Sequence, residues 1–348
     1  MRNILVNLCH GNEPYILGTG IAQGVVERLQ GNDDSRIIVP NLYGKRQERI
    51  MQEEGLLGEK VVLDKDLGEI YKPIIFADAN FGINVKNILE KRKTTEQAVR
   101  DLIQERYGRV FLEVNVGAHF TSGEDIPVFL AYPSIYSELY QRTLEEPELI
   151  RHFNKSDLER LTTEMLKLDE EINTFFVPSH HMLSYDSSRK PFDREVSTPP
   201  LKKIPPVNKD VIPEDSVYVM LSGTGSEMEN SLNIARELND KGHHVFVPFW
   251  TPQELGREYE RKSPEIISNP NLTKVVGRPG WGIIWTCQNA GTNFQALPYT
   301  PGDEPEIFFN VKTLESVPLL EETERQKQKF GTLDGISFVV DDIVKKIN

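Results

Sequence analysis

The chain has 348 residues and a formal net charge of −13, from 53 acidic and 40 basic side chains. This length suits two ordinary α/β domains. The acidic balance argues against a nucleic-acid partner, because no basic excess exists to displace counterions from phosphates. Two cysteines, Cys9 and Cys287, are too few for a disulfide scaffold or a cysteine-rich zinc site. No apolar run reaches the length of a transmembrane segment, so we expect a cytoplasmic protein.

The first half of the chain begins as doubly wound α/β domains begin. A predicted strand at Asn3–Leu8 leads into a loop with Gly18-Thr19-Gly20, and a helical pattern follows at Ile21–Leu29. Further predicted strands are Arg36–Val39, Ile74–Phe76, Val110–Asn115 and Thr174–Pro178, and further predicted helices are Asn84–Tyr107, Pro133–Leu144 and Ser156–Glu171.

A proline-rich segment separates the two halves. Residues 186–213 include Pro191, Pro199, Pro200, Pro205, Pro206 and Pro213 and show no apolar periodicity. Proline disfavours regular structure and favours an extended path. We therefore expect an N-terminal domain at 1–185, a linker at 186–213 and a C-terminal domain at 214–348.

The second half repeats the opening pattern. A strand at Val217–Leu221 precedes the turn Ser222-Gly223-Thr224-Gly225-Ser226 and a helix at Met228–Lys241. Further strands fit Val245–Pro248, Lys274–Gly277 and Phe294–Pro298, and further helices fit Trp281–Ala290, Glu304–Thr313 and Ile336–Ile347. We expect the last helix to pack back on the first domain.

Glycine-rich turns before helices suit a diphosphate. Glycine lets a ligand approach the backbone closely, and the following helix offers free N–H groups and a positive dipole end. Ser222–Ser226 is one such turn, although packing alone also explains many of them, and no Gly-Lys-Ser/Thr follows to make a Walker loop. The second turn lies in Val275–Asn310, where Gly280 and Gly282 open a helix and Gly291 follows it as an expected left-handed cap.

This second segment resembles the donor-binding signature of the GT-B superfamily of nucleotide-sugar glycosyltransferases. It is most similar to the UDP-glycosyltransferases and to the bacterial N-acetylglucosaminyltransferase of peptidoglycan synthesis. The matching positions are Arg278, Gly280, Trp281, Ala290, Gly291, Pro298, Asp303 and Asn310. The resemblance implies two doubly wound Rossmann-like domains that face each other across a cleft.

The resemblance also implies roles for these residues. Arg278 and the helix start at Gly280, Trp281 and Gly282 would hold the donor diphosphate, and Ser222–Ser226 would face it. Asp303 and Glu304 would accept hydrogen bonds from sugar hydroxyls. Three features depart from the family: Thr286 stands where a ribose-binding Glu is usual, Gly282 and Ile283 replace an Asn or Ser after the Gly-Trp pair, and Glu304 replaces a Gln.

The first domain is expected to supply the acceptor site and a general base. His10 follows the first strand, and His119 follows another apolar strand, with Asp125 nearby as a base or an orienting group. No metal-binding motif is found, so the expected mechanism needs no metal or other cofactor.

These observations predict a glycosyltransferase that moves a sugar from a nucleotide diphosphate donor, first of all a UDP-sugar, to an unknown small-molecule, lipid or glycan acceptor. A nucleotide-sugar epimerase or hydrolase on the same fold is one alternative. A non-catalytic nucleotide-sugar-binding protein is the other, and the departures at Thr286, Ile283 and Glu304 favour it.

Overall fold

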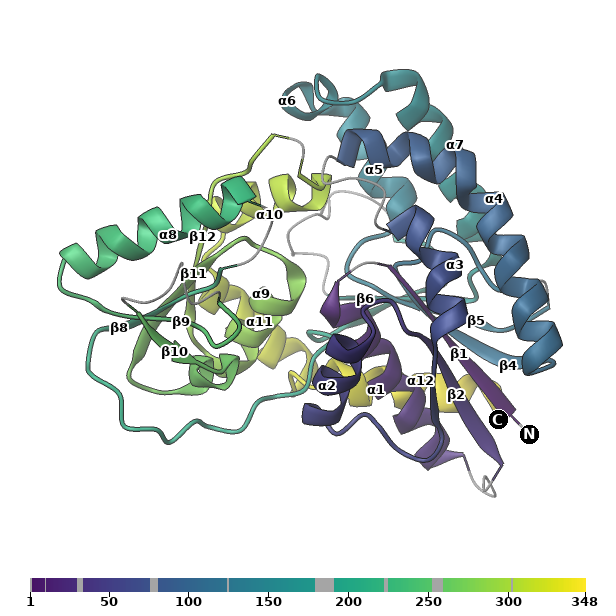
Figure 1. Ribbon diagram of the computed structural model, residues 1–348, viewed down its shortest axis with the longest axis horizontal. Helices are drawn as coiled ribbons and strands as arrows, with labels where there is room; N and C mark the ends of the chain where they lie inside the picture. The colour runs from purple at the N-terminus through teal and green to yellow at the C-terminus, as the bar shows by residue number, and fades with distance from the viewer. Residues whose placement is uncertain are drawn as a thin grey trace. The chain divides into compact units, whose positions relative to one another are not determined.

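The computed structural model describes residues 2–9, 11–29, 34–75, 81–123, 125–178, 191–221, 225–251, 259–301 and 303–348, with backbone alone at 81–83 and 225–228. The chain forms two compact units, each built on its own parallel sheet (Figure 1). The described residues of unit 1 fall within Met1–His180, Ser188–Leu201 and Gly335–Asn348, and those of unit 2 fall within Lys202–Asp334.

Unit 1 contains a seven-stranded parallel sheet in the order β3-β2-β1-β4-β5-β6-β7. Its strands are β1 (Arg2–Leu8), β2 (Ser35–Pro40), β3 (Val61–Asp64), β4 (Val110–Val116), β5 (Val128–Ala131), β6 (Thr174–Pro178) and β7 (Glu195–Thr198). The strand order reverses between β1 and β4, where doubly wound sheets open toward a ligand at their carboxyl edge.

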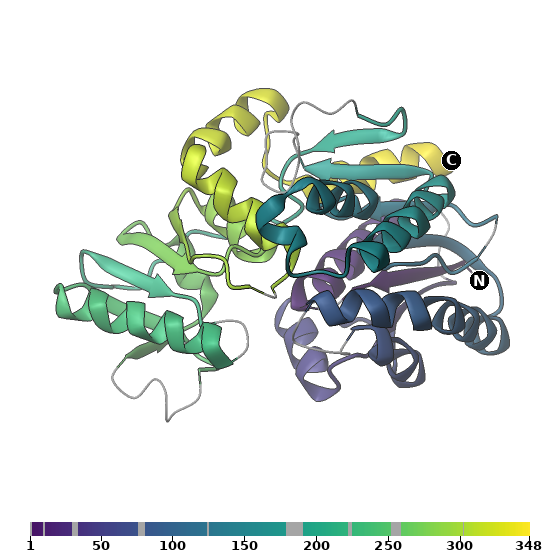
Figure 2. The same cartoon turned by 90° about the horizontal axis from the view of Figure 1, so that it is seen from above.

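Helices cover both faces of this sheet, which explains why the central strands read as apolar runs. They are α1 (Asn12–Arg28), α2 (Lys45–Glu53), α3 (Lys65–Ile75), α4 (Phe81–Arg106), α5 (Tyr136–Glu145), α6 (Pro147–Ile150), α7 (Lys155–Glu171) and α12 (Gly335–Ile347). The C-terminal helix α12, yellow in Figure 2, packs against α1, and Arg28 Nε lies 2.8 Å from Asp341 Oδ1.

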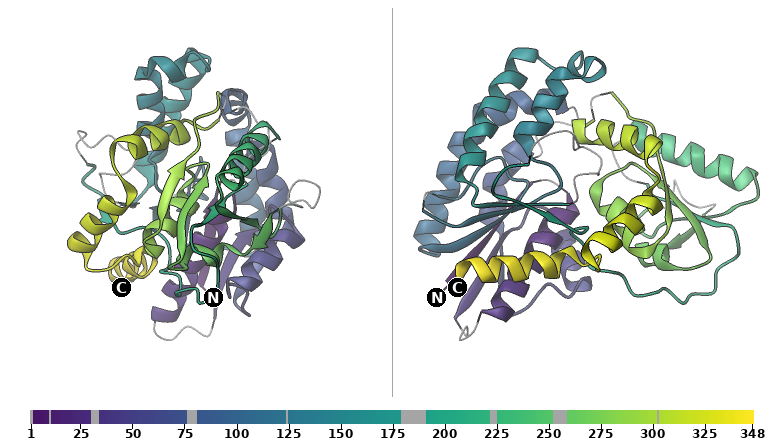
Figure 3. Two further views of the ribbon diagram at one scale, coloured as in Figure 1. Left: turned by 90° about the vertical axis from the view of Figure 1, so that its left-hand side faces the viewer. Right: turned by 180° about the vertical axis from the view of Figure 1, so that it is seen from behind.

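Unit 2 repeats the design on a smaller scale. Its sheet has the order β10-β9-β8-β11-β12, again with parallel neighbours, as Figure 3 shows in green. The elements are β8 (Ser216–Val219), α8 (Gly225–Asp240), β9 (His244–Pro248), β10 (Glu260–Lys262), the 3-10 turn Pro264–Ser268, β11 (Leu272–Gly277), α9 (Trp281–Ala290), β12 (Asn293–Ala296), α10 (Pro305–Ser316) and α11 (Leu319–Phe330). The predicted class, two doubly wound Rossmann-like domains, is confirmed.

The first predicted glycine turn is wrong. Gly18-Thr19-Gly20 lies inside α1, which begins at Asn12. A Cβ on Gly18 would lie 2.4 Å from Val6 Cγ1 and 2.9 Å from Val116 Cγ2. Gly18 therefore serves close packing of the helix on β1 and β4, and it does not form a phosphate-binding turn.

Other elements differ from the predictions because short runs carry little periodicity. Ile74 and Ile75 end helix α3 instead of forming a strand; Leu67, Tyr71 and Ile74 form the buried face of that helix. Strand β7 interrupts the segment predicted as a linker, and Pro199 follows it without breaking it. The pattern also missed β3, β5, β10, α2, α3, α6 and α11. Among the described residues, no helix is long and apolar enough to cross a membrane.

Candidate functional site

The carboxyl edge of the unit 2 sheet carries the residues of the predicted donor signature. Strand β11 ends at Gly277, three residues turn the chain, and α9 begins at Trp281 with Gly280 as its N-cap. No described side chain caps this helix, so the first-turn N–H groups of Trp281 and Gly282 have no partner within the helix. An uncapped helix start at a carboxyl edge suits an anion.

An ion pair joins this turn to the next loop. Arg278 Nε donates to Asp303 Oδ2 at 2.8 Å, and Nη2 donates to Asp303 Oδ1, which makes the pair bidentate. Arg278 Nη2 also lies 3.3 Å from Glu304 Oε2. The structure thus brings three predicted site residues into one charged cluster, which we call the Arg278 cluster: Arg278, Asp303 and Glu304.

The Arg278 cluster is held by its surroundings. Asp303 Oδ1 accepts from the backbone N–H of Glu304 at 2.8 Å, and the Tyr299 hydroxyl donates to the Asp303 carbonyl at 3.0 Å. Buried Asn310 donates from Nδ2 to the Pro279 carbonyl at 2.8 Å, which ties α10 to the turn before α9. The side chains of Arg278, Asp303 and Glu304 are 24%, 10% and 18% exposed, so the cluster reaches the surface.

The side chains of two further predicted donor-site residues, Thr286 and Trp281, make contacts within α9. The Thr286 hydroxyl donates to the Gly282 carbonyl at 2.7 Å, so its proton is used within α9. The Trp281 ring is buried, with its centroid 5.4 Å from that of Trp285, so its backbone N–H is the group at the helix start. Gly291 has φ 72° and caps α9 in the left-handed conformation, as predicted.

The other glycine turn is described only in part. Ser222, Gly223 and Thr224 lie outside the described residues. Gly225 and Ser226 form the start of α8 and so belong to the helix instead of the turn before it. The strand before them, β8, is the neighbour of β11 in the sheet, so the carboxyl ends of these two parallel strands lie side by side.

In unit 1, His119 lies in the loop after β4, and His10 lies outside the described residues. His119 Nε2 is 2.9 Å from the Tyr140 hydroxyl, and its ring stacks on Tyr136 with centroids 4.2 Å apart. Asp125 is exposed and has φ 62°, a left-handed conformation that Asp tolerates. His119 is therefore part of an aromatic stack, and Asp125 is open to solvent.

Sequence reasoning missed a buried polar network behind the His119 loop. Glu113 Oε1 accepts from Asn7 Nδ2 at 2.8 Å and from Asn115 Nδ2 at 3.0 Å, and its Oε2 accepts from the Ser122 N–H at 2.7 Å. The Tyr71 hydroxyl donates to Asn7 Oδ1 at 2.7 Å. We call Asn7, Tyr71, Glu113, Asn115 and Ser122 the Glu113 network.

The Glu113 network fixes the loop that carries His119. Burial raises the pKa of the Glu113 carboxyl, while the hydrogen bonds from Ser122, Asn7 and Asn115 oppose the shift. Asn7 Nδ2 also donates to the Phe120 carbonyl at 2.8 Å, so both ends of the loop are tied to the sheet. The signal in the sequence was a polar residue at alternate positions of two apolar strands, at Asn7 and at Glu113 and Asn115.

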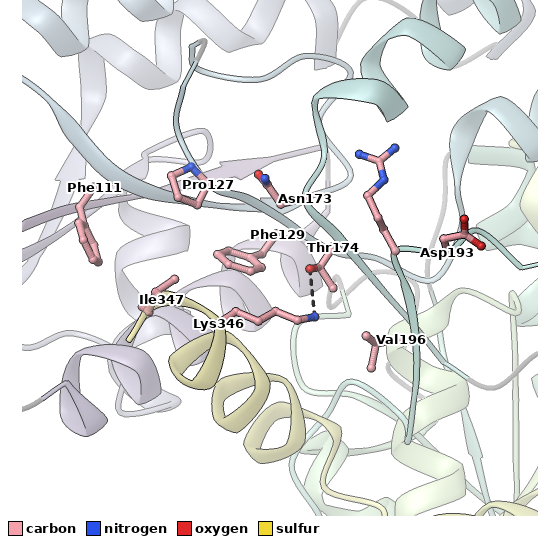
Figure 4. A pocket seen from close by; sticks show the side chains of 10 residues that line it. Phe111, Pro127, Phe129, Asn173, Thr174, Asp193, Val196, Lys346 and Ile347 are labelled. Atoms are coloured by element: carbon pink, nitrogen blue, oxygen red, sulfur yellow. Dashed lines mark hydrogen bonds between the residues drawn. The ribbon is translucent and has the colours of Figure 1, made fainter.

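A separate hollow of about 650 Å³ lies at the amino edge of the unit 1 sheet (Figure 4). Phe111, Pro127 and Phe129 form an apolar wall, and Lys346 from α12 reaches Thr174 Oγ1 at 3.1 Å. The described residues that line it include none of the predicted site residues.

Within the described ranges, no group of three or more His, Cys, Asp or Glu side chains could hold a metal ion.

Neither a family model nor a curated protein matches the sequence. Solved structures do match the fold. CalG4, the calicheamicin glycosyltransferase, has a TM-score of 0.60 at 13% identity, with 100% of this chain and 98% of that chain covered. UGT71G1 of Medicago truncatula, solved with UDP-glucose, has a TM-score of 0.60 at 12% identity, with 99% and 98% covered.

A UDP-glucosyltransferase of Polygonum tinctorium that can glucosylate indoxyl also has a TM-score of 0.60, at 14% identity and with 99% of this chain and 98% of that chain covered. At these identities the likeness concerns the fold. It extends over nearly the whole of each chain, and it agrees with two parallel sheets of seven and five strands. The chain has the GT-B glycosyltransferase fold.

Proposed function

We propose that this protein transfers a sugar from a nucleoside diphosphate sugar, first of all a UDP-sugar, to a hydroxyl group of a small-molecule acceptor. One observation carries the proposal: an uncapped helix start and the Arg278 cluster lie at the same carboxyl edge of the unit 2 sheet. N–H groups suit the diphosphate, and carboxylates suit the hydroxyls of a sugar. The GT-B fold of the chain supports the same assignment.

The proposed reaction is metal-independent. As the bond between sugar and diphosphate breaks, negative charge grows on the leaving phosphate, and the N–H groups at the start of α9 would stabilise it. A general base in unit 1 would take the proton of the acceptor hydroxyl. His10, His119 and Asp125 are our candidates, and the hydrogen bond between His119 and Tyr140 would orient the His119 ring.

The solved structures support the choice of substrates. UGT71G1 was solved with UDP-glucose, and the Polygonum tinctorium enzyme can glucosylate indoxyl, an aromatic acceptor. We therefore propose UDP-glucose as the first donor and an aromatic hydroxyl compound as the first acceptor to try.

Calorimetric titration with UDP and with UDP-glucose tests donor binding, and release of UDP with and without acceptor tests catalysis. Transfer predicts acceptor-dependent UDP release. This release should fall at least about tenfold in the variant that lacks the general base. His10→Ala, His119→Ala and Asp125→Asn identify that base, and His152→Ala is the matched control, since His152 is not a candidate base and its Nε2 lies 3.2 Å from Nε of the neighbouring Arg151. If the protein binds no UDP or GDP compound, the proposal is refuted.

A non-catalytic donor-binding protein is the second candidate. Thr286 favours it, because this position lacks the carboxylate that usually binds the ribose in the family and its hydroxyl proton is used within α9. Binding of UDP-glucose without any UDP release would establish this alternative. UDP release that needs no acceptor would instead indicate a hydrolase.

A further inference from the structure

We infer that Arg278 is a positioning residue for the sugar half of the donor and does not itself bind the diphosphate. The inference rests on the proposed function, and it reassigns the cation that the family resemblance would give to the phosphates. Arg278 would act by holding Asp303 and Glu304 where sugar hydroxyls reach them.

The hydrogen bonds of Arg278 carry the first step. Its Nε and Nη2 form a two-point contact with the Asp303 carboxylate, and Nη2 also reaches Glu304. A planar guanidinium bound at two points is fixed in orientation as well as in position. Nε and Nη2 could turn toward a diphosphate only after this contact broke; Nη1 takes no part in the contact and lies 3.8 Å from the place that a Cβ on Gly280 would occupy.

Burial makes that break costly. Asp303 is only 10% exposed, so loss of its cation would leave a carboxylate in a poorly hydrated place. The Arg278 cluster holds one positive and two negative groups, so its formal charge is already negative before a diphosphate approaches. Electrostatics therefore favour the N–H groups at the start of α9, and not this cluster, as the partner of the phosphates.

The contact also joins two loops. Arg278 follows β11, whereas Asp303 precedes α10 by two residues, and 25 positions separate them in the chain. Asp303 Oδ1 accepts from the Glu304 N–H at 2.8 Å, so a shift of Asp303 would move Glu304 with it. Each carboxylate oxygen has two lone pairs, so both side chains can accept hydroxyl protons while Arg278 stays bound.

Two roles for Arg278 predict different losses of affinity. If Arg278 binds phosphate, Arg278→Gln weakens UDP and UDP-glucose equally, and Arg278→Lys restores much of both through its charge. If Arg278 positions the carboxylates, UDP binds Arg278→Gln within about threefold of wild type, whereas the Kd of UDP-glucose rises about tenfold. Arg278→Lys then behaves like Arg278→Gln, because an ammonium lacks the planar fork.

Isothermal titration of each variant with UDP, UDP-glucose and UDP-galactose is the test. Arg325→Gln is the matched control, since Arg325 pairs with Glu322 on α11 of the same unit. Asp303→Asn should reproduce the selective loss, and the double variant Arg278→Gln/Asp303→Asn should lose little more than either single one. In both single variants and in the double variant, the ratio of the Kd values for UDP-glucose and UDP-galactose should move closer to one.

Equal losses of UDP and UDP-glucose, or an unchanged affinity for UDP-glucose, would overturn the inference while donor binding stands. Wild-type protein that binds no nucleotide would instead remove the proposed function, and the inference with it. Circular dichroism of each variant separates loss of binding from loss of folding, and Arg278→Lys provides a second variant that keeps the charge.

Discussion

The two units place their polar groups differently at the carboxyl edge of the same kind of sheet. In unit 1, Glu113 is fully buried and all its described hydrogen bonds go to the chain itself. In unit 2, the Arg278 cluster reaches the surface beside an uncapped helix start. The first arrangement stabilises a loop, and the second presents charge and N–H groups to a ligand. One strand order can thus support either a structural or a binding role.

The largest effect should come from the Glu113 network. Glu113→Ala removes one of two acceptors from each of the buried Asn7 and Asn115 amide groups, and it removes the acceptor of the Ser122 N–H. At about 1–3 kcal/mol for each of the three lost hydrogen bonds, we expect the free energy of unfolding of unit 1 to fall by roughly 3–9 kcal/mol. Asp303→Ala should cost less, about 1 kcal/mol, because the Arg278 side chain that it leaves behind is 24% exposed and can be hydrated.

Differential scanning calorimetry measures both changes. All three tryptophans, Trp250, Trp281 and Trp285, belong to unit 2, so tryptophan emission reports unit 2 alone. Equal losses of stability in the two variants would erase the contrast between the units. Glu105→Ala, on the exposed side of α4, is the control for loss of an ordinary glutamate.

A second effect concerns pH and unit 1. Burial raises the pKa of Asp169 to about 6 from its ordinary 3.8, although the Ser137 hydroxyl and Arg194 oppose the shift. The folded state then holds the proton more tightly than the unfolded state, so stability falls as pH rises from about 4 to about 6. Asp169→Asn should remove this slope and stabilise unit 1 at pH 7 by on the order of 3 kcal/mol.

Urea unfolding of wild type and Asp169→Asn between pH 4 and pH 8 gives the comparison. Parallel curves for the two proteins would show that the carboxyl of Asp169 is not the source of the slope. Since Asp169 belongs to unit 1, the tryptophan-monitored transition of unit 2 should keep the same pH dependence in both proteins.

A third and smaller effect compares two glycines of α1. Gly18→Ala places a methyl group 2.4 Å from Val6 Cγ1, and we expect a cost of about 1–3 kcal/mol. A Cβ on Gly20 would meet its nearest atom, on Ile336, at 3.9 Å, an ordinary contact. Gly20→Ala should therefore be neutral or gain up to about 1 kcal/mol from helix propensity. Calorimetric midpoints that fall equally for both variants would contradict the packing role of Gly18.

The smallest effect should appear at the end of α9. Gly291 has φ 72°, so Gly291→Ala should cost about 1 kcal/mol. Gly58→Ala is the control, because a Cβ there meets no atom within 4 Å and its backbone is not left-handed. Differential scanning calorimetry of both variants follows the change, because Gly58 lies in unit 1 and Gly291 in unit 2. A loss larger than that of Glu113→Ala would mean that α9, and not the Glu113 network, limits stability.

Much of the architecture could be predicted from local patterns. Apolar strands followed by amphipathic helices appear twice, and they predicted two parallel sheets. Gly291 was correctly predicted as a left-handed cap, since Gly alone adopts that conformation without strain. Short elements such as β7 and α6 were missed, because four residues show no period.

The sequence by itself therefore determined the class of fold and the residue types at the donor signature, because both depend on neighbours close in the chain. Only the tertiary structure decided which distant groups meet. Adjacent parallel strands β11 and β12 bring Arg278 and Asp303 into contact across 25 positions. In the same way β1 and β4 bring Asn7 to Glu113, and the absence of a side chain at Gly18 lets α1 lie close to Val6. Such contacts arise from strand register and close packing, which no local pattern encodes.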